Sequence, residues 1–198
     1  MPTDLISSLR SVAVFCGSRF GLDPAYRRAA EALGAGLAAA GLRLVYGGGR
    51  VGLMGVVADA ALAGGGQVLG VIPDFLQRRE VAHGGPVELV ITETMHDRKR
   101  QMFAAADAFV MMPGGFGTFD ETIEITTWRQ LGLHDKPVLI CDVEGWAQPY
   151  VDMLKAAIRH GFAEPSTAFL YEVLPDVPSV LARLETLARP GVGQPEKV

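Results

Sequence analysis

The residues best suited to chemistry lie in one glycine-rich segment, Pro-Gly-Gly-Phe-Gly-Thr-Phe-Asp-Glu, at positions 113–121. Glycines let the backbone come close to a phosphate, and the helix expected to begin at Thr118 offers free N–H groups to an anion. Glu121 lies about one turn into that helix, where it could transfer a proton or complete a capping box with Thr118. The segment therefore predicts an anion site with a carboxylate beside it.

A second carboxylate, Glu124, lies three residues beyond Glu121 and so on the same face of the expected helix. Two close carboxylates raise the pKa of one of them, which suits proton transfer. A solvent-exposed acid on a helix surface explains the same spacing, so both interpretations of Glu124 stay open.

Three consecutive cations, Arg98, Lys99 and Arg100, lie near the start of another expected helix that begins at Met95. A helix turns by about 100° per residue, so Arg98 or Lys99 can point to the site while Arg100 is solvated. The planar fork of an arginine matches a phosphate or a pair of ribose hydroxyls.

Two further glycine turns follow expected strands, at residues 17–21 and 47–52. In a parallel sheet all three turns lie at the edge where open α/β sheets bind ligands. Ser18 in the first is either a phosphate or sugar donor or a plain turn residue. The second matches G-x-G-x-x-G with Asp74 about 20 residues beyond, so an NAD-dependent oxidoreductase and purely structural glycines are both alternatives.

The elements that must position these turns are short apolar runs that alternate with segments of helical period. This pattern predicts an α/β fold with a parallel sheet covered by helices on both faces. The first helix is expected to follow Asp23 and Pro24 and to end near Gly41. Seven strands are expected, at residues 11–16, 42–46, 67–72, 87–92, 108–112, 137–141 and 168–173.

The composition indicates one ordinary globular domain: the chain has 198 residues, of which 49% are apolar and 20% charged. We expect a domain over residues 1–188 and a flexible tail over 189–198, which is rich in proline and glycine. The formal charge of -4, without a long basic run, argues against nucleic acid as a partner.

The chain shows neither a signal-peptide pattern nor an apolar run long enough for a membrane span, so we expect a cytoplasmic protein without a membrane partner. Cys16 and Cys141 lie far apart within expected strands, which favours buried thiols in a reducing compartment. The four histidines lack metal-ligand spacing, and no metal site is expected.

Three motifs, taken in their order along the chain, resemble the LONELY GUY family of cytokinin riboside 5′-monophosphate phosphoribohydrolases. They are Gly-Gly-Gly-Arg-Val-Gly-Leu-Met-Gly at 47–55, Met-His-Asp-Arg-Lys at 95–99 and the segment 113–121. The resemblance spans roughly residues 12–184. It implies a Rossmann-like fold, a homodimer and no cofactor. It also implies hydrolysis of the N-glycosidic bond of AMP or an N6-modified AMP such as N6-prenyl-AMP, releasing the free base and ribose 5-phosphate.

The same resemblance implies that Arg98 and Glu121 form the catalytic pair. It implies that residues 115–118 hold the 5′-phosphate, that Lys99 adds charge there, and that Glu80 and Thr127 line the nucleotide site. The N6 substituent would contact residues 73–81. The predicted substrate-binding residues are Gly17, Ser18, Gly48, Glu80, Lys99, Gly114, Gly115, Phe116, Gly117, Thr118, Asp120, Glu124 and Thr127.

A nucleotide-binding sensor and an NAD-dependent oxidoreductase are the alternatives to this hydrolase, and the residues argue against a decarboxylase. Members of this family have carried the label lysine decarboxylase, but that chemistry needs pyridoxal phosphate on a lysine. Only Lys99 of the four lysines lies near the expected site, and phosphate binding explains it equally well. A nucleotide-binding sensor would use the same phosphate loops and perform no chemistry.

Overall fold

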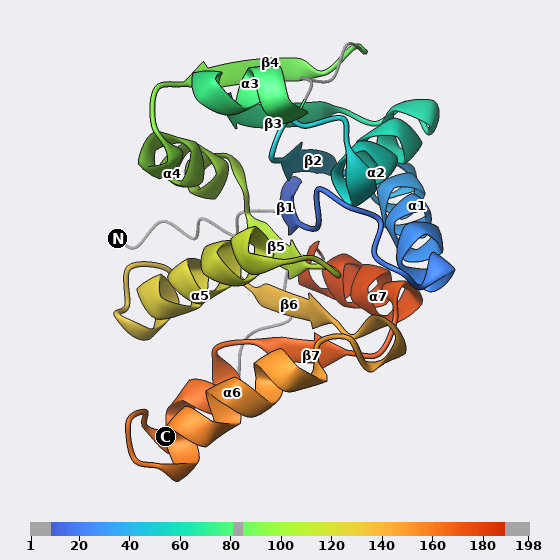
Figure 1. Ribbon diagram of the computed structural model, residues 1–198. Helices are drawn as coiled ribbons and strands as arrows, with labels where there is room; N and C mark the ends of the chain where they lie inside the picture. The colour runs from blue at the N-terminus through green and yellow to red at the C-terminus, as the bar shows by residue number, and fades with distance from the viewer. Residues whose placement is uncertain (1–8, 81–84, 189–198) are drawn as a thin grey trace, which may run out of the picture.

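A computed structural model describes residues 9–80 and 85–188, except for the side chains of residues 78–80. Within these residues a seven-stranded parallel sheet forms the centre of the molecule (Figure 1). Its strands are β1 (Ser11–Phe15), β2 (Arg43–Tyr46), β3 (Val68–Pro73), β4 (Glu88–Thr92), β5 (Ala108–Met111), β6 (Val138–Cys141) and β7 (Glu172–Leu174).

Helices connect these strands in the alternating order that the sequence predicts. They are α1 (Pro24–Ala39), α2 (Gly52–Ala63), α3 (Asp74–Glu80), α4 (Met95–Ala105), α5 (Phe116–Gln130), α6 (Gln148–Arg159) and α7 (Val177–Ala188). Two short 3-10 helices, η1 (Val143–Gly145) and η2 (Pro165–Phe169), flank α6. No helix among the described residues is both long and apolar enough to cross a membrane.

The strand order is β4-β3-β2-β1-β5-β6-β7, so the chain builds outward in both directions from the central pair β1 and β5. Loops that leave two such adjacent strands run to opposite sides and open a crevice at the carboxyl edge of the sheet. The glycine turns after β1 and β5 lie at this switch point. The topology therefore confirms the Rossmann-like α/β fold and brings the predicted anion loops together.

Both faces of the sheet are buried because the side chains of each strand alternate between two cores. In β1, Val12 and Val14 pack with α1, α2 and α7 in one apolar cluster. Ala13 and Phe15 belong to a second cluster on the other face, which includes residues of α4 and α5. Figure 1 shows α1, α2 and α7 together on one side of the sheet and α4, α5 and α6 on the other.

The Asp23 side chain caps α1 as expected, by accepting a hydrogen bond from the Ala25 N–H at 2.8 Å. The seventh strand is shorter than expected, because residues 165–169 form η2 and β7 begins at Glu172. Pro165 at the start of η2 favours this helical turn, and the Thr167 hydroxyl donates back to the Glu164 carbonyl. The predicted tail, 189–198, lies outside the described residues.

Candidate active site

Gly17 ties the three glycine turns together through its backbone. Its N–H donates to the Pro113 carbonyl in the turn after β5 (3.0 Å), and its carbonyl accepts from the N–H groups of Leu53 and Met54 in α2. A Cβ at Gly17 would lie 3.2 Å from the Cα of Gly114, so the two loops touch. Gly17 is therefore a structural junction as well as part of the wall of the site.

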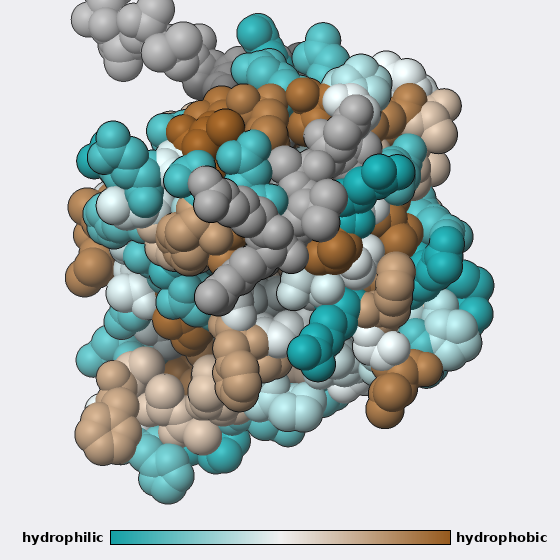
Figure 2. Space-filling model, turned by 45° about the horizontal axis from the view of Figure 1, so that its top comes forward, coloured by the Kyte–Doolittle hydropathy of each residue, from teal (hydrophilic) through white to brown (hydrophobic). Residues whose placement is uncertain are grey.

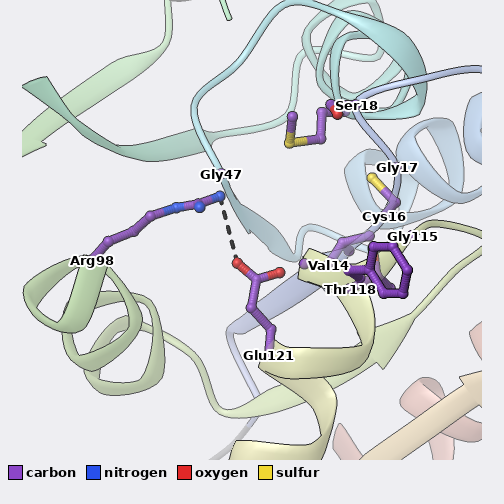
Figure 3. Close-up of a pocket in the computed structure, with 12 residues that line it drawn as sticks. Val14, Cys16, Gly17, Ser18, Gly47, Arg98, Gly115, Thr118 and Glu121 are labelled. Atoms are coloured by element: carbon purple, nitrogen blue, oxygen red, sulfur yellow. Dashed lines mark ion pairs between the residues drawn. The ribbon is translucent and has the colours of Figure 1, made fainter. Parts of the chain in front are cut away.

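Where these loops meet, a cavity of about 160 Å³ opens at the carboxyl edge of β1 (Figure 3). Arg98 enters it from α4 and Glu121 from α5, so residues far apart in sequence face one another across it. The lining residues are Val14, Cys16, Gly17, Ser18, Gly47, Met54, Arg98, Gly115, Phe116, Gly117, Thr118 and Glu121.

The amino end of α5 forms the anion-binding part of the cavity. The helix begins at Phe116 with Gly115 as its N-cap, and no side chain caps it. Its first N–H groups have no intrahelical partner and carry the positive end of the helix dipole. Gly115, Phe116, Gly117 and Thr118 all line the cavity, so the cavity extends to this helix end and offers space for a phosphate there.

Thr118 does not begin the helix, which corrects the expected capping box with Glu121. It is the third helical residue, 3% exposed, and its carbonyl accepts a hydrogen bond from the Thr122 hydroxyl (2.7 Å). Its hydroxyl occupies the space in which a Cβ of Gly114 would have to lie. With the cap at Gly115, Glu121 lies in the second turn of α5 and not at the capping-box position, and it lines the cavity.

Arg98 and Glu121 form a buried ion pair, with Nη2 and Oε1 separated by 3.5 Å and both residues less than 10% exposed. The guanidinium is fixed by a second contact, because its Nε donates to the carbonyl of Val71, within β3 (3.1 Å). A Cβ at Gly47 would overlap the same guanidinium, so glycine at this position makes room for Arg98. Charge-assisted hydrogen bonds are usually about 2.7–2.9 Å long, so the pair is loose.

Lys99, the next residue, faces a different group of acids. Its Nζ lies 2.6 Å from Asp120 Oδ2 and 3.3 Å from Glu124 Oε2, in a contact between α4 and α5. Burial by itself lowers the pKa of Lys99, but the hydrogen bond to Asp120 and the charge of Glu124 outweigh it and raise that pKa. Arg100 is exposed, as expected.

Several predicted binding residues lie outside the cavity. Asp120 and Thr127 are exposed on α5, and Glu124 pairs with Lys99. Gly48 packs against β3, since a Cβ there would meet Ile72, while its neighbour Gly47 faces the cavity. Glu80 is the last residue of α3, and its side chain is outside the described residues.

Sequence reasoning missed Cys16 and Met54, which also line the cavity. Burial raises the pKa of the Cys16 thiol, and the nearby negative charge of Glu121 adds to the shift. The thiol is therefore a neutral part of the wall and not a nucleophile. The position of Cys16, directly before the Gly17 turn, was a signal that could have placed it there.

The second glycine turn does not provide a dinucleotide phosphate site. The first-turn N–H groups of Leu53 and Met54 in α2 donate to the Gly17 carbonyl and are not available to a phosphate. The glycines of this turn serve packing, because a Cβ at Gly52 would overlap the backbone of Ser18. This geometry favours the structural interpretation of the G-x-G-x-x-G motif over the oxidoreductase.

Comparison with known families identifies related sequences. The model of a family described as "possible lysine decarboxylase" matches residues 54–184. A probable cytokinin riboside 5′-monophosphate phosphoribohydrolase of Oryza sativa subsp. japonica is 45% identical over 179 residues, which are 90% of this chain and 79% of the relative. The cytokinin riboside 5′-monophosphate phosphoribohydrolase of Rhodococcoides fascians is 42% identical over 178 residues, 89% of this chain and 90% of the relative.

Solved structures with the same fold are more distant in sequence. The Moco carrier protein of Chlamydomonas reinhardtii superposes with a TM-score of 0.68 at 20% identity, over 90% of this chain and 97% of that one. The molybdenum cofactor binding protein of Rippkaea orientalis gives 0.68 at 18% identity, over 91% and 98%. These likenesses establish the Rossmann-like architecture alone.

Proposed function

We propose that this chain, which belongs to the family of cytokinin riboside 5′-monophosphate phosphoribohydrolases, hydrolyses the N-glycosidic bond of adenosine 5′-monophosphates, including N6-modified ones. The products are the free base and ribose 5-phosphate. The observation that supports the proposal is the buried Arg98–Glu121 pair, which lines the same cavity as the start of α5, a helix end that no side chain caps.

The cavity can orient a nucleotide by its two ends. A 5′-phosphate at the N–H groups of residues 116–118 is held by backbone donors and the dipole of α5. The ribose then extends toward Glu121 and Arg98, which line the same cavity. At about 160 Å³ the cavity suits the ribose phosphate, and the base projects from its mouth.

Cleavage of the bond between C1′ and the base develops positive charge on the ribose. The Glu121 carboxylate stabilises that charge and deprotonates the attacking water, while Arg98 stabilises negative charge on the nucleotide. The loose 3.5 Å pairing lets a ribose hydroxyl or a water take up part of the hydrogen bonding of either group. The water oxygen bonds to C1′ as the bond from C1′ to the base breaks, and the proton that the water loses is balanced by the one that the departing base nitrogen gains.

The decarboxylase description fits this geometry poorly. A Schiff-base lysine must be close to its substrate and lose its proton readily. Lys99 instead makes two carboxylate contacts that raise its pKa, and it does not line the cavity of Arg98 and Glu121.

We also propose that the protein is a homodimer that packs through α5 and the turn after it. Asp120, Glu124, Thr127 and Leu131 recur along one face of this helix, and Leu131 and Leu133 are about two-thirds exposed. On the face of the molecule that Figure 2 presents to the viewer, apolar residues form several separate groups among polar ones. Sedimentation as a monomer at micromolar concentration would contradict the dimer.

The cytoplasmic location and the absence of a nucleic-acid partner stay predictions.

The test of the activity is to incubate the purified protein with AMP and with N6-prenyl-AMP and to separate the products by chromatography. The proposal predicts equal amounts of free base and ribose 5-phosphate, and the ratio of the two rates measures the preference for the N6 substituent. Tight AMP binding without base release over hours would instead indicate a nucleotide sensor.

A further inference from the structure

A second cavity, of about 540 Å³, lies beside the turns after β1 and β5, and the proposed function does not use it. Arg98 and Glu121 do not line it, so it is a pocket separate from theirs. Small-molecule sites usually have volumes of about 300–1,000 Å³, and the second cavity falls within that range. The two cavities are neighbours, because four residues line both: Gly17, Ser18, Gly115 and Phe116.

Aromatic side chains dominate the lining of the second cavity. Phe20, Tyr26, Phe116 and Trp146 are four of its 12 lining residues, although aromatic residues make up only 8% of the chain. Phe116 is 92% exposed and Phe20 49% exposed, so both rings offer apolar surface to a ligand. Planar rings pack favourably against aromatic side chains, offset-stacked or edge-on. The lining therefore suits a flat, ring-shaped molecule.

Contacts behind the cavity hold two of these rings in place. Trp146 stacks on Phe119 of α5, with ring centroids 5.6 Å apart and an angle of 10° between the planes. The guanidinium of Arg27 lies over the Phe20 ring, 5.6 Å from its centroid, and is itself paired with Glu31 at 3.1 Å. Rings positioned in this way receive a ligand at a smaller entropic cost than free side chains do.

Two polar side chains at the cavity are available to a ligand. Ser18 and Arg19 are exposed, and within the described part of the chain neither side chain forms a hydrogen bond or an ion pair. Guanidinium N–H groups and a hydroxyl can donate to ring nitrogens. Among the described lining residues Arg19 is the one that carries a charge, so the cavity holds no acid to attract a cation.

We infer that the second cavity binds a planar heteroaromatic base as a second ligand, beside the nucleotide and not joined to it. The ring packs against Trp146 and Phe20, and its nitrogens accept hydrogen bonds from Arg19. Leu53 adds apolar surface for a substituent on the ring. The choice of base rests on the proposed function, because the free base that this reaction releases is a molecule of this class.

The test is calorimetry with N6-prenyladenine on the Glu121→Gln variant, which would not consume AMP. At saturating AMP the first cavity is filled, and we expect one base to bind per chain with an affinity that AMP leaves within threefold. Adding Trp146→Ala should weaken base binding about tenfold, as the loss of one stacking partner commonly does, and leave AMP binding unchanged. Phe162→Ala, at an 87% exposed ring outside the cavity lining, should change neither.

The same titration tests the polar contact. Arg19→Ala should weaken base binding, while Arg28→Ala, at an exposed arginine outside the lining, should not. A melting curve checks the fold of Trp146→Ala, and Phe20→Ala repeats the test at a half-exposed position if that variant is unstable.

The inference is overturned if saturating AMP abolishes base binding, because the base then occupies the first cavity. It is also overturned if Trp146→Ala weakens the base no more than Phe162→Ala does. The proposed function fails separately, when the wild-type protein releases no base from AMP or N6-prenyl-AMP. Titration of N6-prenyladenine into the AMP-free protein, with and without Trp146→Ala, tests the second cavity even then.

Discussion

Two neighbouring residues of α4, Arg98 and Lys99, each reach an acid on α5, and the two contacts differ in almost every respect. The Arg98 contact with Glu121 is buried, 3.5 Å long and lines a cavity. The Lys99 contacts with Asp120 and Glu124 are as short as 2.6 Å and lie outside that cavity. Similar charges one residue apart therefore serve different purposes.

The difference shows what distinguishes a reactive pair from a structural one. Lys99 has two acidic partners, which hold α4 against α5. Arg98 is fixed at Nε by the Val71 carbonyl, so its terminal nitrogens are positioned without being drawn fully onto Glu121. A pair kept near, but not at, hydrogen-bond length beside an open cavity can exchange contacts with a substrate.

The glycine turns show the same contrast. The amides of Leu53 and Met54, after the turn at 47–52, donate to the Gly17 carbonyl, while the residues that follow Gly115 line the cavity. A G-x-G-x-x-G pattern alone does not reveal which amides are already used within the fold.

The largest expected effect comes from exchanging the two acids for their amides. Glu121→Gln should reduce kcat for AMP by about 10³-fold or more, because it removes the charge that stabilises the ribose and the base that activates water. Glu124→Gln should stay within about threefold of the wild-type rate, because Glu124 pairs with Lys99. Steady-state kinetics test both, with melting curves as the control. Equal losses of kcat in the two variants would contradict the distinction between a catalytic Glu121 and a structural Glu124.

The corresponding exchange of the two cations should give a smaller difference. Arg98→Lys keeps the charge but loses the planar fork that contacts Val71 and Glu121 together, and should reduce kcat/KM by about 10²- to 10³-fold. Lys99→Arg keeps an ion pair with Glu124 and should change kcat/KM little. A larger loss of kcat/KM from Lys99→Arg than from Arg98→Lys would assign the catalytic role to Lys99 in place of Arg98.

The Gly47→Ala variant tests the position of Arg98 without altering any charge. The new methyl group would overlap the Arg98 guanidinium and displace it from Glu121. A displacement of about 1 Å can cost about 10²-fold in rate, and we expect kcat/KM to fall by that order. Kinetics and a melting curve on the same preparation provide the check, and an unchanged rate in a folded variant would show that the position of Arg98 is not critical.

The smallest effect concerns the stability that Lys99 provides. A double-mutant cycle with Lys99→Met and Glu124→Gln should give a coupling of about 1 kcal/mol in the free energy of unfolding, with little change in KM for AMP. A tenfold rise in KM without a loss of stability would favour the phosphate contact that the family resemblance implies for Lys99.

The same contribution should depend on pH in one direction. The folded pKa of Lys99 is raised, so its stabilising effect is complete below the unfolded value of about 10.4 and is lost as pH rises through the folded pKa. The difference in urea midpoint between wild type and Lys99→Met should therefore shrink above that pH. A difference that grows there would contradict the raised pKa.

The fold was predictable from the sequence to within a few residues, because alternating apolar runs and helical periods report local structure directly. The largest difference is at the seventh strand, predicted over residues 168–173, because the proline-led turn η2 extends to Phe169 and β7 begins only at Glu172. The family resemblance implied that Arg98 and Glu121 are the catalytic pair. It did not imply their 3.5 Å separation, because the place of Arg98 depends on the Val71 carbonyl in β3 and on the space beside Gly47, directly after β2. The local sequence around Trp146 did not indicate that this residue lies beside the phosphate loops, because only the folded chain brings it there.

A crystal structure of the Glu121→Gln variant with bound AMP tests directly whether Arg98 and Glu121 face the reacting ribose. We expect the 5′-phosphate at the N–H groups of residues 116–118 and C1′ of the ribose between Arg98 and position 121. A phosphate bound at the turn 47–52, or a ribose turned away from Arg98 and position 121, would contradict it.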